Sequence, residues 1–358
     1  TRVAVYDRKK KTKYIMYVDM NNLYGKAMME DLPIGDYKWM TENELSVFDE
    51  KKMEEDPKYG LKMLKELIKK GRGFHLKVDV DYPCELHDLH NLYPLLAEQM
   101  EVQPADYSDI MRKMKEASGG SDKPSPKLIP NLRNKKGYVI HSKALLQALE
   151  LGLHLKKVHK GVSYKQEAWL KPYIEHNTKL RTEAKNDFEK DFFKLCNNAI
   201  FGKTMENVRN RIDYKICSTE KQIKRASSNP RFKRLNVFGE QCVGVQFEKV
   251  SVALNKPIPV GCSILDLSKT YMNDYHYNHI LKLYDHTKVK LLFTDTDSFC
   301  YEIECEDFYK DMADNIDWYD TSNLPDDHPM FSIVSPAMRE HLAKGKNKKV
   351  PGKMKCEA

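Results

Sequence analysis

An apolar stretch interrupted by two acids, residues 289–304 (VKLLFTDTDSFCYEIE), constrains the fold of this chain more than any other segment. Apolar and polar residues alternate with a period of two after the acids, which predicts two short strands joined at a tight turn. Asp295 and Asp297 lie two residues apart in that turn. In extended chain such side chains share a face, so the two carboxylates repel unless a cation lies between them. The pair therefore predicts a site for Mg²⁺ or Mn²⁺.

Three other interpretations of this acidic turn stay open from the residues alone. Asp is a common turn residue, so the turn can be a solvated β-turn. A haloacid-dehalogenase-type phosphatase has a DxDx[T/V] pattern, but Phe299 occupies the Thr/Val position and no later Gly-Asp-x-x-x-Asp follows. An EF-hand loop that begins at Asp295 would place Cys300 where glycine is required. A further carboxylate, distant in sequence, favours the metal site over these alternatives.

That carboxylate is Asp19, which ends a second apolar stretch, residues 14–19 (YIMYVD). The stretch predicts a buried strand. Asn21 and Asn22 follow it and can cap a helix with one apolar face made of Leu23, Tyr24, Ala27 and Met28. A strand that ends in an acid before a helix presents a carboxylate at the edge of a sheet. Taken alone, Asp19 is also explained as an acid at a helix N-terminus.

Two long helices are predicted between the acidic segments, over residues 166–185 and 187–205, because apolar residues recur there every three or four positions. The joint between them lies near Asn186, a residue type that suits a helix C-cap. Helices of this length with so short a joint form an antiparallel hairpin.

A stripe of polar residues follows the second helix of this hairpin. Lys190, Lys194 and Asn198 recur every four residues, with Phe201 close to the stripe, and Arg181 closes the first helix. Cations followed by an amide and an aromatic ring can bind a nucleoside triphosphate, with the cations at the phosphates and the ring at the base. A solvated charged helix face is the alternative.

Composition narrows the class of protein. The 358 residues exceed one ordinary core and predict two or three subdomains, and the net charge of +8 permits a polyanionic partner. The eight cysteines have no Cys-x-x-Cys or zinc spacing, which predicts reduced thiols in an intracellular protein. No apolar run reaches membrane length. Several histidines lack a Cys or carboxylate partner at ligand spacing and are expected to be ordinary helix-face residues: His87, His90, His276, His279 and His286.

The remaining segments are assigned from periodicity and turn residues. A polar helical region is expected at 36–72, a helix at 142–151, an apolar helix packed on a sheet at 264–284, and strands at 73–82, 138–141, 153–164 and 242–254. Residues 118–130 (SGGSDKPSPKLIP) indicate a linker, and residues 209–239 alternate basic and aromatic residues in the manner of a nucleic-acid-binding surface. The polar tail at 344–355 is expected to be mobile or bound to phosphate.

Three segments together resemble the motifs of family B DNA polymerases. DMNNLYGKAM at Asp19 resembles motif A (DxxSLYP), KLCNNAIFG at Lys194 resembles motif B (KxxxNSxYG), and FTDTDS at Phe293 resembles motif C (YxDTDS). Their order and approximate spacing agree with the family. The flanking residues 138–174 and 261–280 resemble the organellar and viral branch, the protein-primed polymerases of viruses, linear plasmids and Maverick/Polinton-type transposons. The departures from the motifs are Asn22, Gly25, Ala199, Phe201 and Phe293.

The resemblance implies an α+β fold in which a palm, an antiparallel sheet with helices, carries helical-hairpin fingers. It implies a DNA-directed DNA polymerase that adds dNTPs to a primer 3′-hydroxyl under the direction of a template. Asp19 and Asp297, assisted by Asp295 and the main-chain carbonyl of Met20, would hold two Mg²⁺ or Mn²⁺ ions. The expected partners are template and primer DNA, dNTPs and a terminal protein primer, with no membrane.

The resemblance also assigns the nucleotide-binding residues. Tyr24 would lie under the deoxyribose and clash with a 2′-hydroxyl. Asn198 and Phe201 would line the nascent base pair. The phosphates would be bound by Arg181, Lys190 and Lys194.

On this resemblance the chain divides into seven segments. These are the palm with motif A (1–35), an insertion that contacts a terminal protein (36–130), a palm–fingers connection (131–165), the fingers (166–205), a second insertion for processivity (206–241), the palm with motif C (242–335) and a basic tail that leads to a thumb (336–358). The chain is expected to be a fragment without exonuclease domain or thumb. The alternative that stays open is a catalytically inactive, domesticated nucleic-acid-binding remnant of such a polymerase.

Overall fold

The computed structural model describes residues 12–119, 126–325, 327–328, 330–331, 336 and 347–357. The chain forms two compact units, one from Thr1–Asn198 with Cys262–Ala358 and the other from Ala199–Gly261. Helices are combined with mainly antiparallel sheets, which confirms the predicted α+β class.

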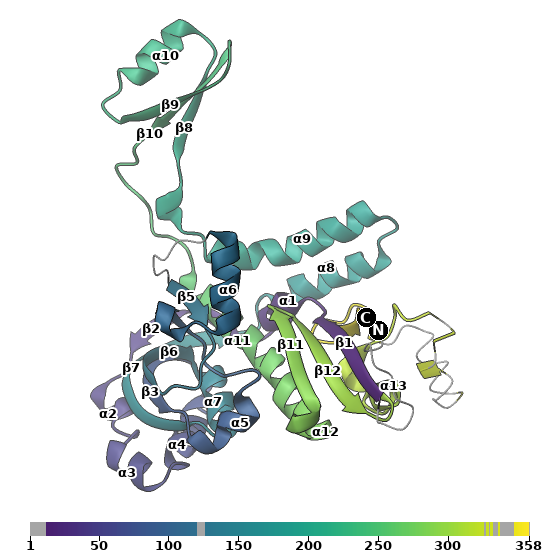
Figure 1. Ribbon diagram of the computed structural model, residues 1–358. Coiled ribbons are helices and arrows are strands. Elements are labelled where there is room, and N and C mark those ends of the chain that lie inside the picture. Colours follow the sequence, from purple (N-terminus) through teal and green to yellow (C-terminus); the bar gives the residue numbers. More distant parts are fainter. Residues whose placement is uncertain are drawn as a thin grey trace. The chain divides into compact units, whose positions relative to one another are not determined.

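The first unit contains the sheet that carries the acids, with strand order β11-β12-β1-β14-β13 (Figure 1). β11 (Val289–Asp295) and β12 (Ser298–Cys305) form the predicted hairpin. β1 (Thr12–Met20) pairs antiparallel with β12, and Asp19 lies opposite Ser298 in the register. Two segments far apart in the sequence therefore bring their acids to the same end of one sheet.

A long helical segment packs on this sheet, as predicted. It consists of α11 (Ile258–Asn273), a π-helical stretch (Asp274–Ile280) and α12 (Leu281–Leu283). The Tyr275 ring stacks on Phe299, with 6.2 Å between centroids. The histidines of this segment are buried rather than exposed on a helix face, and each bonds a tyrosine hydroxyl: His276 to Tyr301 and His279 to Tyr319.

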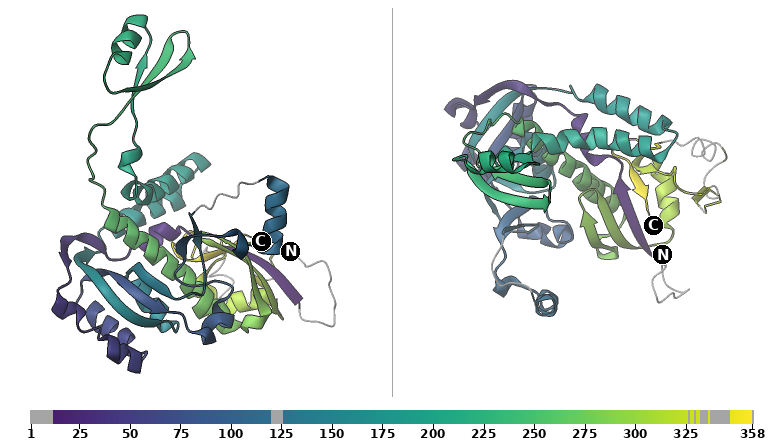
Figure 2. Two further views of the ribbon diagram at one scale, coloured as in Figure 1. Left: turned by 60° about the vertical axis from the view of Figure 1, so that its left-hand side comes forward. Right: turned by 90° about the horizontal axis from the view of Figure 1, so that it is seen from above.

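The end of the chain corrects the prediction of a mobile polar tail. β14 (Met354–Cys356) lies between β1 and β13 (Tyr319–Asp320), antiparallel to the first and parallel to the second (Figure 2). Met354 and Cys356 are 0% and 3% exposed and pack in the sheet's core. Two alternate apolar residues are enough to fill the core here, and the lysines around them hide the pattern. Residues 344–346 of the predicted tail lie outside the described residues.

A second sheet of the first unit has the order β2-β7-β3-β6, all antiparallel. Its strands are β2 (Leu32–Trp39), β3 (Gly73–Asp81), β6 (Lys135–His141) and β7 (His154–Glu167). α4 (Tyr59–Ile68) and α7 (Ser142–Glu150) contribute Leu64 and Leu145 to its core. Residues 36–39, predicted to be helical, belong to β2, because a left-handed Asp36 lets the chain continue along β7.

The remaining elements of the first unit are short. They are α2 (Glu42–Leu45), α3 (Glu50–Glu55), α5 (His87–His90), β4 (Glu98–Glu101), α6 (Asp109–Ser118), β5 (Pro126–Ile129) and α13 (Phe308–Asp314). β5 pairs with β4, so the last part of the predicted linker at 118–130 is a strand, and residues 120–125 lie outside the described residues.

The predicted helical hairpin is present as α8 (Lys171–Glu183) and α9 (Asp187–Thr204), which lie side by side in Figure 1. α8 starts five residues later than predicted because β7 continues to Glu167. Asn186 does not cap the end of α8. Its side-chain oxygen accepts from the Glu189 N–H at 2.8 Å, so it caps the start of α9.

The second unit is a three-stranded sheet of order β8-β10-β9 with one helix. It is built from β8 (Asp213–Cys217), α10 (Glu220–Ser227), β9 (Phe232–Gly239) and β10 (Cys242–Phe247). Its core contains Cys217, Ala226, Val245 and Phe247. β10 ends at Phe247, so the predicted strand at 242–254 is too long. The predicted insertion at 206–241 falls inside this unit, and the division into seven segments stays a prediction.

None of the described helices is long and apolar enough to cross a membrane.

Candidate functional site

Asp19 and Asp297 meet where β1 passes the turn between β11 and β12. The Met20 N–H donates to the Asp297 carbonyl at 2.7 Å, which ties the two acidic segments together directly after the β1–β12 ladder ends. Burial and then the negative charge of Asp297 raise the pKa of Asp19 to about 6. The two carboxylates therefore act on each other.

Positive charges of the chain partly compensate this pair. Burial is the main cause that raises the pKa of Asp297, and the charge of Asp295 raises it further. Lys194 on α9 lowers the pKa of both Asp19 and Asp297, and Lys355 on β14 lowers that of Asp19. The structure thus brings the predicted motif B lysine to the two acids.

The predicted tight turn that carries Asp297 is present, and within it the chain between the two acids is bent rather than extended. The Asp297 N–H donates to the Asp295 carbonyl at 2.6 Å, and Thr296 between them has φ +54°. A β-branched residue in the left-handed region stores strain that the surroundings must offset. Hydroxyl groups support the turn: Thr294 donates to the Ser298 carbonyl at 2.8 Å, and Ser298 donates to the Asp295 carbonyl at 3.2 Å.

Asp295, the third predicted acid, is exposed in the turn. Its charge acts on Asp297, and its carboxylate accepts from the Thr296 hydroxyl at 3.2 Å. Among the described residues, no three His, Cys, Asp or Glu side chains gather closely enough to hold a metal ion. The acids that act on each other across the two segments are Asp19 and Asp297, and the charge of Glu357 also acts on Asp19.

Tyr24 lies next to this pair on α1 (Leu23–Met28). Burial and then the charge of Asp297 raise the pKa of its phenol. As predicted, Asn22 caps the helix: with φ +45°, it accepts from the Gly25 N–H at 3.2 Å. A Cβ atom at position 25 would lie 2.1 Å from the Asn22 amide nitrogen, so this cap requires glycine.

The other predicted phosphate-binding residues lie on the α8–α9 hairpin. Lys194 is exposed and forms no ion pair with any described residue, whereas Lys190 pairs with Asp187 at 2.9 Å. Arg181 is partly buried, and its Nε has no hydrogen-bond partner among the described residues. Asn198 is exposed one turn beyond Lys194.

Two further predicted site residues, Phe201 and Met20, differ from the others in where their side chains lie. Phe201 belongs to the second unit, so the first unit alone contains the other predicted site residues. The Met20 side chain is 2% exposed in the core, so only its main chain is available at the site.

Sequence reasoning missed Asp320 near the site, and it placed Lys349 only within a tail expected to be mobile or bound to phosphate. The Asp320 carboxylate is 2% exposed and accepts from the Asn21 side chain at 2.7 Å and from the Lys349 N–H at 2.8 Å. The Lys349 ammonium donates to the Arg181 carbonyl at 3.1 Å. Asp320 has no motif, and its one sequence signal is an acid that directly follows the aromatic pair Trp318 and Tyr319.

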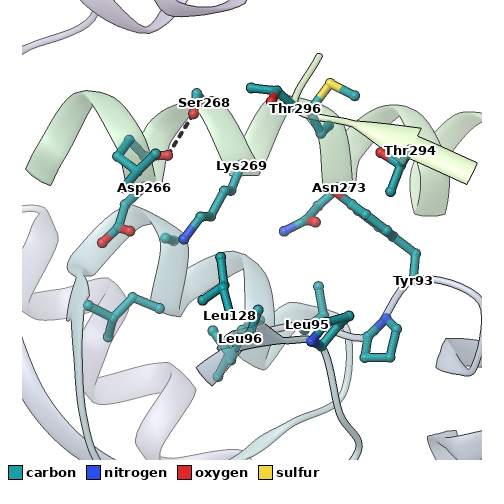
Figure 3. A pocket seen from close by; sticks show the side chains of 18 of the residues that line it. Tyr93, Leu95, Leu96, Leu128, Asp266, Ser268, Lys269, Asn273, Thr294 and Thr296 are labelled. Atoms are coloured by element: carbon teal, nitrogen blue, oxygen red, sulfur yellow. Dashed lines mark hydrogen bonds between the residues drawn. The ribbon is translucent and has the colours of Figure 1, made fainter. Parts of the chain in front are cut away.

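A cavity of about 400 Å³ lies beside the acidic turn (Figure 3). Tyr24 and Thr296 line it at the turn, and Asp266, Lys269 and Asn273 of α11 line it farther away. Burial raises the pKa of the Asp266 carboxyl, which accepts from the His141 N–H at 2.9 Å. The wall is otherwise mainly apolar.

No family model matches the chain. No curated protein matches it either. Among solved structures, the chain is similar to phi29 DNA polymerase complexed with primer-template DNA and incoming nucleotide substrates (15% identity, TM-score 0.43) and to phi29 DNA polymerase in an orthorhombic crystal form (12% identity, TM-score 0.41). Each alignment covers 86% of this chain and 42% of the other, so the chain spans less than half the length of these polymerases. The likeness is a distant structural relationship.

Proposed function

We propose that this chain is the palm and fingers portion of a DNA-directed DNA polymerase that adds dNTPs to a primer 3′-hydroxyl under the direction of a template. One observation carries the proposal: Asp19 and Asp297, from distant segments, meet at one sheet end, and the charge of Lys194 acts on both. The motif resemblance found in the sequence supports it independently. A solvated β-turn gives no reason for a second acid and a lysine from a distant helix to gather there.

The donor set fits Mg²⁺. This ion is commonly bound by one or two carboxylates together with substrate phosphates, so a site does not need three acidic side chains. Asp19, Asp297 and the main-chain carbonyl of Met20 would hold the ions, with Asp295 adding negative charge beside Asp297. Burial first and then the charge of Asp297 raise the pKa of Asp19, and the nearby lysines only partly offset this, so a cation between the two carboxylates would be favoured. When bound, Mg²⁺ lowers the pKa of the primer hydroxyl and neutralises phosphate charge.

The chain's own side chains then position the substrates. The primer 3′-oxygen forms a bond to the α-phosphorus while the bond to the bridging oxygen breaks and pyrophosphate leaves. Positioning and charge stabilisation supply most of the catalysis in such a transfer. Lys194, Lys190 and Arg181 offset the charge of the triphosphate. Tyr24, beside Asp297, lies under the deoxyribose and rejects a 2′-hydroxyl by contact.

The proposal extends to the protein-primed branch and to the insertions. Residues 36–130 would contact a terminal protein, and residues 206–241 would hold DNA for processive synthesis. The basic residues of the second unit support DNA binding there, because lysine and arginine neutralise backbone phosphates. Removing residues 219–238 from a full-length enzyme is expected to shorten its products. Unchanged product length would remove this assignment.

The test is template-directed incorporation of labelled dNTPs on a primer–template, with Mg²⁺ or Mn²⁺. Asp297→Asn keeps the shape of the side chain and removes its charge, and it is expected to abolish incorporation. Asp314→Asn is the matched control, because Asp314 is an exposed acid at the end of α13. Wild-type incorporation that survives in Asp297→Asn overturns the proposal. Hydrolysis of small phosphate esters without incorporation indicates a phosphatase, and DNA binding without either activity indicates the inactive remnant.

A further inference from the structure

A turn over residues 347–352 approaches the helical hairpin from a distant part of the sequence. Asn347 and Lys349 have φ values of +64° and +57°, and a lysine rarely adopts this conformation. The Asn347 amide donates to the carbonyls of Ile316 and Tyr319 at 3.2 and 2.9 Å. The Gly352 N–H donates to the Asn21 carbonyl at 2.8 Å. Three hydrogen bonds outside the ordinary ladders therefore hold the turn in a strained shape.

Asp320 fixes this turn to the strand end that carries Asp19. One oxygen of its buried carboxylate accepts from both the Asn21 amide and the Lys349 N–H. The other oxygen accepts from the Ser322 N–H at 3.0 Å. A buried carboxylate with three donors is well compensated, and loss of any donor leaves charge without a partner. The position of Lys349 is thus coupled to the residue two places after Asp19.

The Lys349 ammonium lies among other cations. It donates to the Arg181 carbonyl at 3.1 Å, near the end of α8. After burial, the positive charges of Arg181, Lys348 and Lys190 lower the pKa of Lys349, while the charge of Asp320 raises it less strongly, and Asp191 likewise raises the pKa of Arg181. Within the described part of the chain, no carboxylate forms an ion pair with Lys349 or Arg181, and the Arg181 Nε is buried without a hydrogen-bond partner. Repelling cations with an unused donor favour a bound anion.

A cavity of about 340 Å³ borders the same contact. Lys348, Val350 and Pro351 of the turn line one part of it, and α8 lines another with Thr178, Thr182 and the acids Glu175 and Glu183, so this cavity marks the contact and is not itself the anion site. Residues 347–352 therefore face the last two helical turns of α8, and their contact with the helix is not limited to the hydrogen bond between Lys349 and Arg181.

We propose that Lys349 is a further phosphate-binding cation of the nucleotide site, delivered by this turn and positioned by Asp320. The inference rests on the proposed function. After its bond to the Arg181 carbonyl, the ammonium keeps two N–H donors for phosphate oxygens. The competing role is a cap for the C-terminal carbonyls of α8, which needs a donor but not a charge. This difference separates the two roles.

The test measures binding of inorganic tripolyphosphate with Mg²⁺ by calorimetry, alongside thermal unfolding. Lys349→Gln keeps an N–H donor and loses the charge, whereas Lys349→Arg keeps both. Lys348→Gln is the matched control, because it removes the same charge from the exposed neighbour. We expect Lys349→Gln to bind tripolyphosphate about 10-fold more weakly or worse, the loss of one charge-assisted hydrogen bond. Lys349→Arg and Lys348→Gln are expected to stay near wild type.

Equal binding by Lys349→Gln and wild type overturns the assignment of Lys349 and leaves the polymerase proposal standing. A wild-type chain that binds neither tripolyphosphate nor dNTP overturns both. Asp320→Asn tests the positioning role in a double-mutant cycle with Lys349→Gln. Because Asp320 acts through Lys349, its effect on binding should largely vanish in the Lys349→Gln background. Additive effects on binding would remove the positioning role, whatever Asp320→Asn does to the unfolding temperature.

Discussion

Replacing Asp297 by Asn should stabilise the metal-free protein at neutral pH. In the folded state the pKa of Asp19 is raised from 3.8 to about 6, so the folded protein binds more protons than the unfolded chain between these values. Stability contributed by Asp19 is therefore present at low pH and is lost as the pH rises through this window. Removing the charge of Asp297 lowers the pKa of Asp19 toward its ordinary value and recovers part of that loss.

The size of this gain follows from the causes of the shift. The whole shift is about two pKa units, and each unit corresponds to about 1.4 kcal/mol. Burial is the largest cause and remains in the variant, and Glu357 supplies another part. Asp19 is only partly buried, which reduces the energy further. We therefore expect Asp297→Asn to gain about 1 kcal/mol above pH 7, or about 2 °C in melting temperature for a chain of this size.

The assay is denaturant unfolding at pH 4, 5, 6, 7 and 8, without and with Mg²⁺, for wild type, Asp297→Asn and the control Asp314→Asn. The gain should be near zero at pH 4 and full above pH 7. Mg²⁺ should stabilise wild type more than Asp297→Asn, because one of its ligands is removed. A variant that is less stable than wild type at pH 8 without Mg²⁺, or a gain that does not change with pH, would refute the reasoning.

Three further predictions concern the surroundings of the site. Gly25→Ala should destabilise the protein by about 1–3 kcal/mol, the range for overpacking, because the new methyl group collides with the Asn22 cap. Thermal unfolding measures this loss. Gly202→Ala is the control, because a Cβ atom there meets no other atom within 4 Å. Burial lowers the pKa of His75 to about 4 and those of His141 and His276 to about 3. The stability that these neutral histidines contribute should therefore be full above pH 6.5 and fall as the pH drops toward 4. In His141→Gln the free energy of unfolding, measured against pH, should fall less steeply over this range. Met354→Lys should weaken the pairing of β14 with β1, since the side chain is 0% exposed, and hydrogen exchange should be faster at Asn21, whose N–H donates to the Lys353 carbonyl, than it is in Lys353→Met.

Periodicity predicted the strands that carry the acids, because their alternation is long enough to be seen. β1 continues for nine residues and buries alternate side chains at its end, and β12 continues for eight residues with its apolar side chains at alternate positions from Phe299 to Cys305, although Ser298 and Cys300 are buried too. The pairing of β1 with β12, and with it the meeting of Asp19 and Asp297, could not be read from periodicity. It was expected only from the resemblance to polymerase motifs, which fixes the order of the acids and not the register.

Other features escaped because their signals are short or depend on distant partners. β14 has three residues, too few for a periodic pattern. The tight turn at the acids was predicted, but the left-handed conformation of Thr296 within it was not, because nothing in Thr-Asp-Thr-Asp indicates that conformation. Asn186 suits either end of a helix, and only the Glu189 N–H decides which. Asp320 and Lys349 gain their roles from contacts across the chain, so no local pattern marks them.

The place of β14 beside β1 has a consequence for biosynthesis. The strand that ends in Asp19 is flanked on one side by residues near 300 and on the other by residues 354–356. A nascent chain on the ribosome therefore cannot complete this sheet until residues 354–356 have been synthesised, and until then the edge of β1 that pairs with β14 stays open. Pairings this distant in sequence form slowly and expose unpaired edges to aggregation.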